Sequence, residues 1–154
     1  MAKTDEADQG PQGEVAETDS AQHVLDPSLT CFILLAKFLG TPADPAQMVH
    51  DRGRGDEPWS VEDFARISKR LGLISKIRSA RSDDLAKLPL PALAETRSHG
   101  NVILLKIEDA SLKPRYLVQR GDTERPEIWT AEEGAERFTG RILLLTSREA
   151  MAGD

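Results

Sequence analysis

Cys31 is the only cysteine of this chain, and it lies in the stretch LDPSLTCFILLAKFLG, residues 25–40. A lone cysteine acts as a catalytic nucleophile when a helix N-terminus and a neighbouring imidazole lower the pKa of its thiol. Cys31 lies one turn inside the helix that this stretch predicts, and its neighbours, Thr30 and Phe32 among them, include no base. We therefore expect a buried thiol that behaves as a small apolar side chain and is inert.

The three histidines, His23, His50 and His99, show no spacing that indicates a shared metal site, and one cysteine cannot build a thiolate zinc site. His99 immediately precedes a predicted core strand, where it could act as a base, but no nucleophile accompanies it. Gly53 and Gly55 lack the Lys-Ser or Lys-Thr pair of a phosphate-binding loop, and they indicate a charged connector. The sequence therefore predicts neither a metal site nor a phosphate-binding loop.

The chain is acidic, with 26 Asp and Glu against 20 Lys and Arg, a formal net charge of -6 and a pI of about 5.1. This charge disfavours nucleic acid as a partner, because binding to phosphates needs a basic surface. The longest apolar run, Cys31 to Ala36, is far shorter than the ~20 residues of a membrane span, so we expect no membrane insertion. A single cysteine excludes an internal disulfide and fits a reducing, cytoplasmic setting.

One part of the sequence is locally basic, which indicates either a solvated face or a docking patch. Its members are Arg66, Lys69, Arg70, Lys76, Arg78 and Arg81.

Helix signals dominate the first half of the chain, and strand signals dominate the second. Residues 1–22 hold almost no large apolar side chain, so we expect a disordered acidic tail. Asp26 and Pro27 begin a helix that is apolar on every side, which is typical of a buried helix. The expected helices span residues 26–39, 45–50, 61–71 and 130–137, and the expected strands span residues 73–79, 90–95, 101–108, 115–120, 126–130 and 141–147. This order predicts one α+β domain with a mostly antiparallel sheet.

The order and spacing of these segments resemble the N-terminal peptidase-like domain of bacterial ABC exporters. The active members of that family are bacteriocin-processing cysteine peptidases that cut double-glycine leader peptides. The resemblance is carried by DPSLTCFILLAKFLG, WSVEDFARISKRLGL, DDLAKLPLPALAE, NVILLKI, RYLVQR and WTAEEGAERFTGRILLLTSRE. It implies a papain-like cysteine peptidase fold over residues 23–149, with N-terminal helices packed on the sheet. Residues 150–154 would then begin a linker to a transmembrane domain.

This sequence departs from the family at the catalytic positions. The resemblance places the nucleophile position at Pro27, the imidazole position at Asn101 and the carboxylate position at Arg120. It places Cys31 at the second, structural cysteine of the active members. A proline ring cannot replace a thiolate, so the resemblance implies a degenerate catalytic triad.

Further candidate site residues are of two kinds. Some correspond to, or lie close in sequence to, other active-site positions of the family, and others are aromatic. The oxyanion glutamine of the family corresponds to Ala21 here, with Gln22 one place off register. His99 lies two residues before the imidazole position. Trp59, His99 and Trp129 are the candidates for contact with a substrate, since aromatic rings offer large apolar surfaces.

The pattern is similar to the degenerate domains on type I secretion exporters of RTX-type proteins. Those domains bind the unfolded substrate without cutting it. The resemblance implies a non-catalytic domain at the cytoplasmic face of the bacterial inner membrane. Its partners would be the unfolded substrate and the transmembrane and nucleotide-binding domains of the same transporter. No cofactor is expected in this domain, because ATP and magnesium would bind the nucleotide-binding domain.

Two alternatives stay open. One is a leader-peptide-cleaving cysteine peptidase domain, which requires a reactive Cys31. The other is a structural or regulatory module that contacts the transporter itself.

Overall fold

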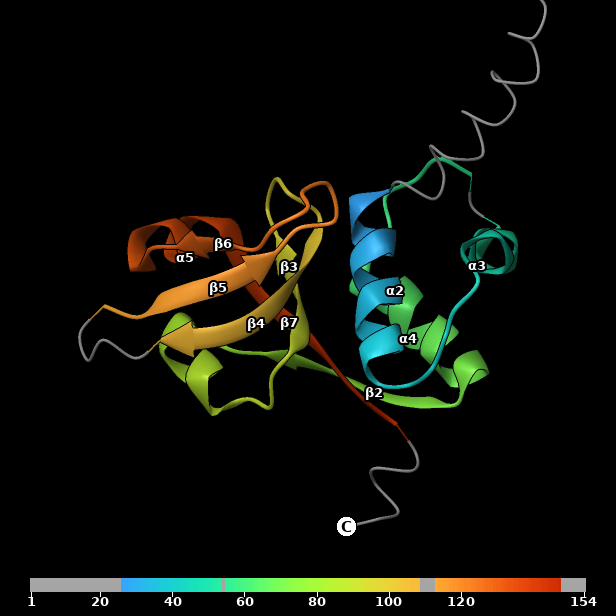
Figure 1. Cartoon of the computed structure of the whole chain (residues 1–154), viewed down its shortest axis with the longest axis horizontal. Coiled ribbons are helices and arrows are strands. Elements are labelled where there is room, and N and C mark those ends of the chain that lie inside the picture. Colours follow the sequence, from blue (N-terminus) through green and yellow to red (C-terminus); the bar gives the residue numbers. More distant parts are fainter. Residues whose placement is uncertain (1–25, 54, 109–112, 148–154) are drawn as a thin grey trace, which may run out of the picture.

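The computed structural model describes residues 26–53, 55–108 and 113–147, and it forms helices first and then an antiparallel sheet (Figure 1). The helices are α2 (Pro27–Phe38), α3 (Pro45–Arg52), α4 (Val61–Leu71) and α5 (Ala131–Arg137), with a 3-10 helix η1 (Ser82–Lys87). The strands are β2 (Leu73–Ser79), β3 (Ala92–Thr96), β4 (Asn101–Glu108), β5 (Arg115–Gln119), β6 (Glu127–Trp129) and β7 (Phe138–Ser147). The six strands lie in the order β2-β7-β3-β4-β5-β6, and each pair is antiparallel, which confirms the predicted α+β class.

Local signals explain where the helices begin and end. The Asp26 carboxylate accepts a hydrogen bond from the Leu29 amide at 3.1 Å, and Pro27 occupies the first turn of α2, where no amide donor is required. At α4, Ser60 and Asp63 form both hydrogen bonds of a capping box. Gly72 ends α4 with a φ of 81°, a left-handed conformation that glycine adopts without a Cβ clash.

The sheet has a helical layer on each side. Figure 1 shows α2, α3 and α4 together on the right of the view. α5 lies on the left, beside β5 and β6. The layer under α2 and α4 buries Leu29, Phe32, Leu35, Phe64, Ile67, Leu93 and Leu143, among others. The layer under α5 and η1 buries Leu85, Val102, Leu104, Tyr116, Val118, Trp129, Phe138 and Ile142. Two separate cores therefore hold the sheet from its two faces.

Several boundaries differ from those expected. β3 begins at Ala92, two residues after the expected 90, and Pro89 and Pro91 precede the start of this interior strand. β7 begins at Phe138, three residues before the expected 141, because pairing with β3 resumes across an irregularity in register. β5 ends at Gln119, which leaves Arg120 just outside the strand. None of the helices in the described ranges is long and apolar enough to cross a membrane.

Candidate functional site

The first turn of α2 meets the sheet where β4 begins and β5 ends. The Ser28 hydroxyl oxygen accepts a hydrogen bond from the Asn101 backbone amide at 2.7 Å, although 73 residues separate the two. Ile103 pairs with Gln119, which brings the start of β4 beside the end of β5. A Cβ on Gly121 would lie 2.1 Å from the Pro27 carbonyl oxygen, so the loop after β5 lies directly against α2. Positions 27, 101 and 120, singled out in the sequence, therefore come from three elements that converge here.

Asn101 joins two parts of the helical layer to the sheet. Asn101 is 2% exposed. Its side-chain Nδ2 donates to the Trp59 carbonyl oxygen at 3.2 Å and to the Ser28 hydroxyl at 3.5 Å. Oδ1 has no hydrogen-bond partner within the described part of the chain. An amide does not titrate near neutral pH, so Asn101 holds the surrounding backbone and cannot act as a general base.

Arg120 is held by carboxylates at the surface. Its Nε and one terminal nitrogen donate to the two Asp122 oxygens at 3.1 and 3.0 Å, and another terminal nitrogen lies 3.5 Å from a Glu127 oxygen. The hydrogen bond from Arg120 lowers the pKa of the Asp122 carboxyl, and the same contact raises the pKa of Arg120. A paired guanidinium stays charged at all physiological pH values and supplies no proton acceptor.

Cys31 lies on the inner face of α2. Its side chain is fully buried, and the thiol donates a weak hydrogen bond to the Gln119 carbonyl oxygen at 3.4 Å. Burial raises the pKa of the thiol from 9.0 to about 12. At neutral pH the thiolate is therefore scarce, and the predicted burial of this cysteine is confirmed.

His99 contacts the other layer of the fold. Its ring lies 5.7 Å from the Trp129 ring, which belongs to the core under α5, and its Nδ1 lies 3.2 Å from the Ser98 hydroxyl. The neighbouring Asn101 side chain faces α2 instead. In the described part of the chain the ring contact of His99 is with Trp129 and its side-chain hydrogen bond is with Ser98, and Gln22 lies outside the described residues.

The two tryptophans lie in packed surroundings. Trp129 is 1% exposed, contacts Phe138 and Arg137, and donates from Nε1 to Glu127 at 2.8 Å. Trp59 is 7% exposed, and its ring stacks on Phe64 at 5.3 Å between centroids. Both rings contribute chiefly to the cores, and Trp59 also lines a cavity.

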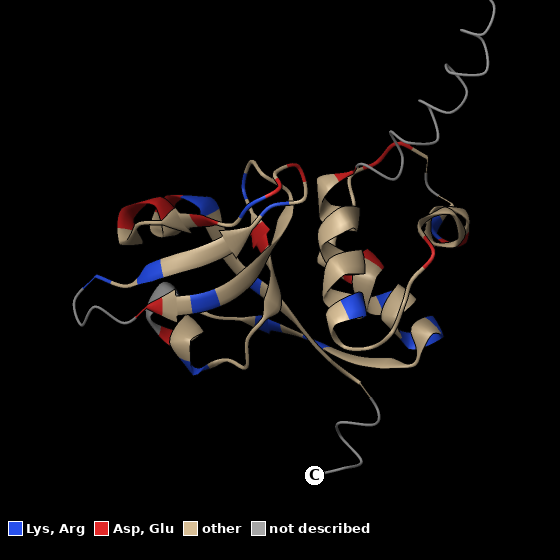
Figure 2. Ribbon diagram, viewed as in Figure 1, with Lys and Arg blue, Asp and Glu red and all other residues tan. Residues whose placement is uncertain are grey.

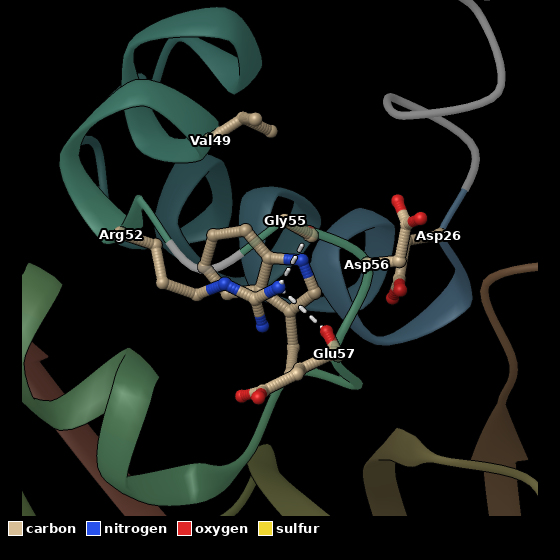
Figure 3. Close-up of a pocket in the computed structure, with 7 residues that line it drawn as sticks. Asp26, Val49, Arg52, Gly55, Asp56 and Glu57 are labelled. Carbon is tan, nitrogen blue, oxygen red and sulfur yellow. Dashed lines mark hydrogen bonds between the residues drawn. The ribbon is translucent and has the colours of Figure 1, made fainter.

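That cavity, of about 260 Å³, lies beside the start of α2 (Figure 3). Asp26, Val49, Arg52, Gly55, Asp56, Glu57 and Trp59 line it. The Arg52 guanidinium stacks on the Trp59 ring at 4.2 Å and donates to the carbonyl oxygens of Gly55 and Glu57 at 3.1 and 2.5 Å. It also pairs with the buried Asp63 carboxylate at 3.4 Å. The Arg52 guanidinium is therefore already paired within the chain, and its contacts link the end of α3 to the segment before α4 and to α4 itself.

A second cavity, of about 230 Å³, lies between α2 and the sheet and is almost entirely apolar. We call it the α2 groove, and it is lined by Leu34, Leu35, Phe38, Pro91, Ile103, Leu105 and Gln119. Leu34 is 44% exposed and Phe38 is 69% exposed. The expectation that α2 is buried on every side is therefore wrong, because the sheet and α4 cover two sides of the helix and leave a third open. An apolar groove of this kind can hold apolar side chains of a peptide.

No three His, Cys, Asp or Glu side chains in the described part of the chain are grouped so as to hold a metal ion.

The sequence model of the peptidase C39 family matches residues 20–150. The chain belongs to the peptidase C39 family. This result confirms the resemblance to the peptidase-like domains of ABC exporters.

Curated relatives are toxin exporters. The chain is 28% identical over 117 residues to the cyclolysin secretion/processing ATP-binding protein CyaB of Bordetella pertussis, a match that covers 71% of this chain and 16% of the relative. It is 26% identical over 128 residues to the alpha-hemolysin translocation ATP-binding protein HlyB of Escherichia coli, covering 82% of this chain and 18% of the relative. The chain thus spans less than a fifth of the length of these relatives.

Two solved structures share the fold. One is the N-terminal peptidase C39 like domain of the toxin secretion ATP-binding protein from Vibrio parahaemolyticus, with a TM-score of 0.63 and 22% identity over 80% of this chain and 98% of that domain. The other is a double glycine motif protease from an AMS/PCAT transporter in complex with the leader peptide, with a TM-score of 0.69 and 14% identity. The second match covers 80% of this chain and 85% of that structure.

Proposed function

We propose that this chain is a non-catalytic domain of a type I secretion ABC exporter, which binds an unfolded RTX-type protein and recruits it to the transporter. The observation that carries the non-catalytic part is the first turn of α2. Pro27 stands there, and Cys31 is fully buried with its thiol pKa raised to about 12. Neither residue offers a thiolate to a peptide bond, and cysteine peptidase chemistry depends on one.

The α2 groove supports the binding part of the proposal. It holds two of the three large apolar side chains that are exposed among the described residues, Leu34 and Phe38. Its sheet side lies next to two positions that the resemblance links to catalysis, since Ile103 follows Asn101 by two residues and Gln119 precedes Arg120, and its helix side is the C-terminal half of α2. An unfolded substrate offers scattered apolar side chains that fit such a groove. Ordering a disordered chain costs several kcal/mol, so we expect an affinity of about micromolar or weaker.

The relatives support the assignment to a transporter, because both named exporters carry the matching segment within a longer chain. In the whole protein, ATP binding and transport would belong to the remaining parts, and the recruited substrate would enter the channel from the cytoplasmic face. Weak binding suits this role, since the substrate must leave the domain.

The test is an NMR titration of the chain with the C-terminal region of a cognate RTX-type protein, with and without calcium. RTX-type proteins fold outside the cell, where calcium is abundant, so we expect shifts only with the calcium-free, unfolded form. Phe38→Ser and Leu34→Ser should each weaken binding by about fivefold to tenfold. Ile128→Ser is the matched control, since Ile128 is an exposed apolar residue of β6 outside the α2 groove. Absence of shifts with both forms, or equal shifts with both, would contradict recruitment.

The competing function is that of a leader-peptide peptidase. It is favoured by membership of a peptidase family and by the similar fold of a protease that was solved with its leader peptide. Incubation with double-glycine leader peptides should leave them intact. Cleavage that disappears in Cys31→Ala would overturn the non-catalytic proposal. Binding to the purified exporter without binding to the substrate would instead favour a structural or regulatory module.

A further inference from the structure

We infer that the outer edge of β2 is a separate binding surface that accepts an acidic, extended polypeptide segment by strand addition. The inference goes beyond the recruitment proposal and does not rest on the α2 groove, because β2 lies at the opposite end of the strand order from β5 and β6.

The first observation is an unpaired backbone edge. β2 is the outermost strand, and all seven of its residues pair with β7 on the inner side. Among the described residues, no strand pairs with its outer side. A strand of this length spans about 23 Å and presents outward-facing N–H and C=O groups that a further strand can bond. α4 packs on one face of β2, where Leu73 and Ile77 join the core, and not along the strand order of the sheet.

The second observation is a concentration of positive charge along that edge. Lys76 and Arg78 are exposed and lie on the same face of β2, since alternate residues of a strand point the same way. Arg81 is exposed just beyond the strand. None of the three has a carboxylate partner within the described part of the chain, unlike Arg66 and Arg70 of α4.

The strand beside the edge adds no negative charge. Neither β2 nor its partner β7 contains Asp or Glu, although the whole chain has a net charge of -6. Figure 2 shows Lys and Arg along β2 and at the end of α4, whereas Asp and Glu are prominent on α5 and near the start of α2. The charge on the edge is therefore local, and it is complementary to an acidic partner.

Charge and edge together favour an extended acidic polypeptide over the other possible occupants. A second copy of the chain would bring its own Lys76 and Arg78 to the same place, and like charges repel edge-to-edge pairing. An anionic lipid surface would satisfy the charges but would not use the backbone groups. An acidic strand satisfies both, because its amides pair with β2 while its carboxylates reach the basic side chains.

The experiment uses the whole chain and a synthetic peptide of seven residues in which Val and Asp alternate. Binding is followed by NMR shifts and by amide hydrogen exchange of residues 73–79. We expect saturable shifts confined to β2 and its surroundings, and slower exchange of the amides that face outward. The peptide in which Lys replaces every Asp, and the acidic peptide with alternate backbone nitrogens methylated, should each bind at least about tenfold more weakly.

Charge-reversal variants test the residues. The double variant Lys76→Glu with Arg78→Glu should lose about tenfold in affinity for the acidic peptide at moderate salt. The matched control is Lys106→Glu with Arg125→Glu, which changes the net charge equally at two exposed positions in β4 and in the loop before β6, away from the β2 edge. All four side chains are exposed, so both variants should fold, which circular dichroism checks.

Three outcomes would overturn the inference. They are an equal loss in both double variants, unchanged binding of the methylated peptide, and binding to phosphatidylserine vesicles with no binding to the peptide. Loss of RTX-type substrate binding in Phe38→Ser, with acidic-peptide binding intact, would separate this surface from the α2 groove.

Discussion

The two ends of α2 meet the sheet in opposite ways. At the N-terminal end, Gly100 and Gly121 pack so closely on Ser28 and Pro27 that an added Cβ would lie 2.6 Å from the Ser28 hydroxyl oxygen and 2.1 Å from the Pro27 carbonyl oxygen. At the C-terminal end, Phe38 is 69% exposed beside a cavity. The end where the family resemblance places catalysis is thus tightly packed, and the end that carries no catalytic position is open. We therefore expect the packed end to contribute to the stability of the domain and the open end to the proposed binding of substrate.

The strongest test of the packed end is Gly121→Ala. The added methyl group would overlap backbone atoms of Pro27, which cannot move as a flexible side chain can. We expect a loss of about 3 kcal/mol or more in the free energy of unfolding, measured by urea denaturation. Gly55→Ala is the control, since its Cβ would meet nothing within 4 Å and only its left-handed φ of 63° opposes the change. Equal losses in the two variants would show that the contact with Pro27 is not tight.

The second test compares two thiols on one helix. In Pro27→Cys the new thiol lies at the helix N-terminus, where the dipole lowers its pKa. It should react with a thiol reagent at pH 7.5 at least about a hundredfold faster than Cys31, whose thiol pKa is about 12.

Full unfolding in guanidinium should remove that difference, and the unsubstituted chain supplies the rate of Cys31 alone. Rapid labelling of Cys31 in the folded chain would contradict its burial and revive the peptidase alternative. Peptide cleavage should stay absent in Pro27→Cys, because Asn101 and Arg120 supply no base.

A smaller effect is expected when the buried thiol is removed. Cys31→Ala should cost about 1 kcal/mol in the free energy of unfolding, because a small buried side chain is lost. The variant should also change the pH dependence. The folded-state pKa is raised from 9.0 to about 12, so the buried thiol stabilises the fold below pH 9, and this contribution is lost as pH rises from 9 toward 12. Denaturation curves of both chains between pH 7 and 10.5 should show a steeper decline with Cys31 present, and parallel curves would refute the raised pKa.

The smallest effect on stability is expected at the open end. Phe38→Ser should change the free energy of unfolding by no more than about 0.5 kcal/mol, since most of the ring is already in solvent. The same variant is expected to weaken substrate binding, and that combination would sharpen the contrast between the two ends of α2. A large drop in melting temperature would show that Phe38 belongs to the core and that the groove is closed in solution.

Much of the fold could be read from local patterns. Asp26 with Pro27, and Ser60 with Asp63, mark the starts of α2 and α4, and the hydrogen bonds that cap both helices are present. The apolar run NVILLKI indicated an interior strand, and β4 is one. These predictions hold because capping and strand alternation depend on residues within a few positions of one another.

Less of the candidate site could be read in the same way. Leu34 and Phe38 share the apolar character of their buried neighbours, so composition alone could not show which side of α2 stays uncovered. The tryptophans drew attention as aromatic residues, yet Trp129 is 1% exposed. Gly121, next to Arg120, is visible in the sequence, but the need for glycine there follows only from its close contact with Pro27 in the fold.

The sequence by itself determined the order of helices and strands, the capping of the helices, membership of the peptidase C39 family and the presence of proline where the family resemblance places a thiol. Only the tertiary structure decided that Cys31 lies against the Gln119 carbonyl, 88 residues away, that Gly121 closes on Pro27, and that β2 forms a sheet edge. The physical reason is one of range. Helix caps and strand patterns arise from neighbours along the chain, whereas burial, pKa and an exposed edge arise from contacts that exist only when distant segments pack together.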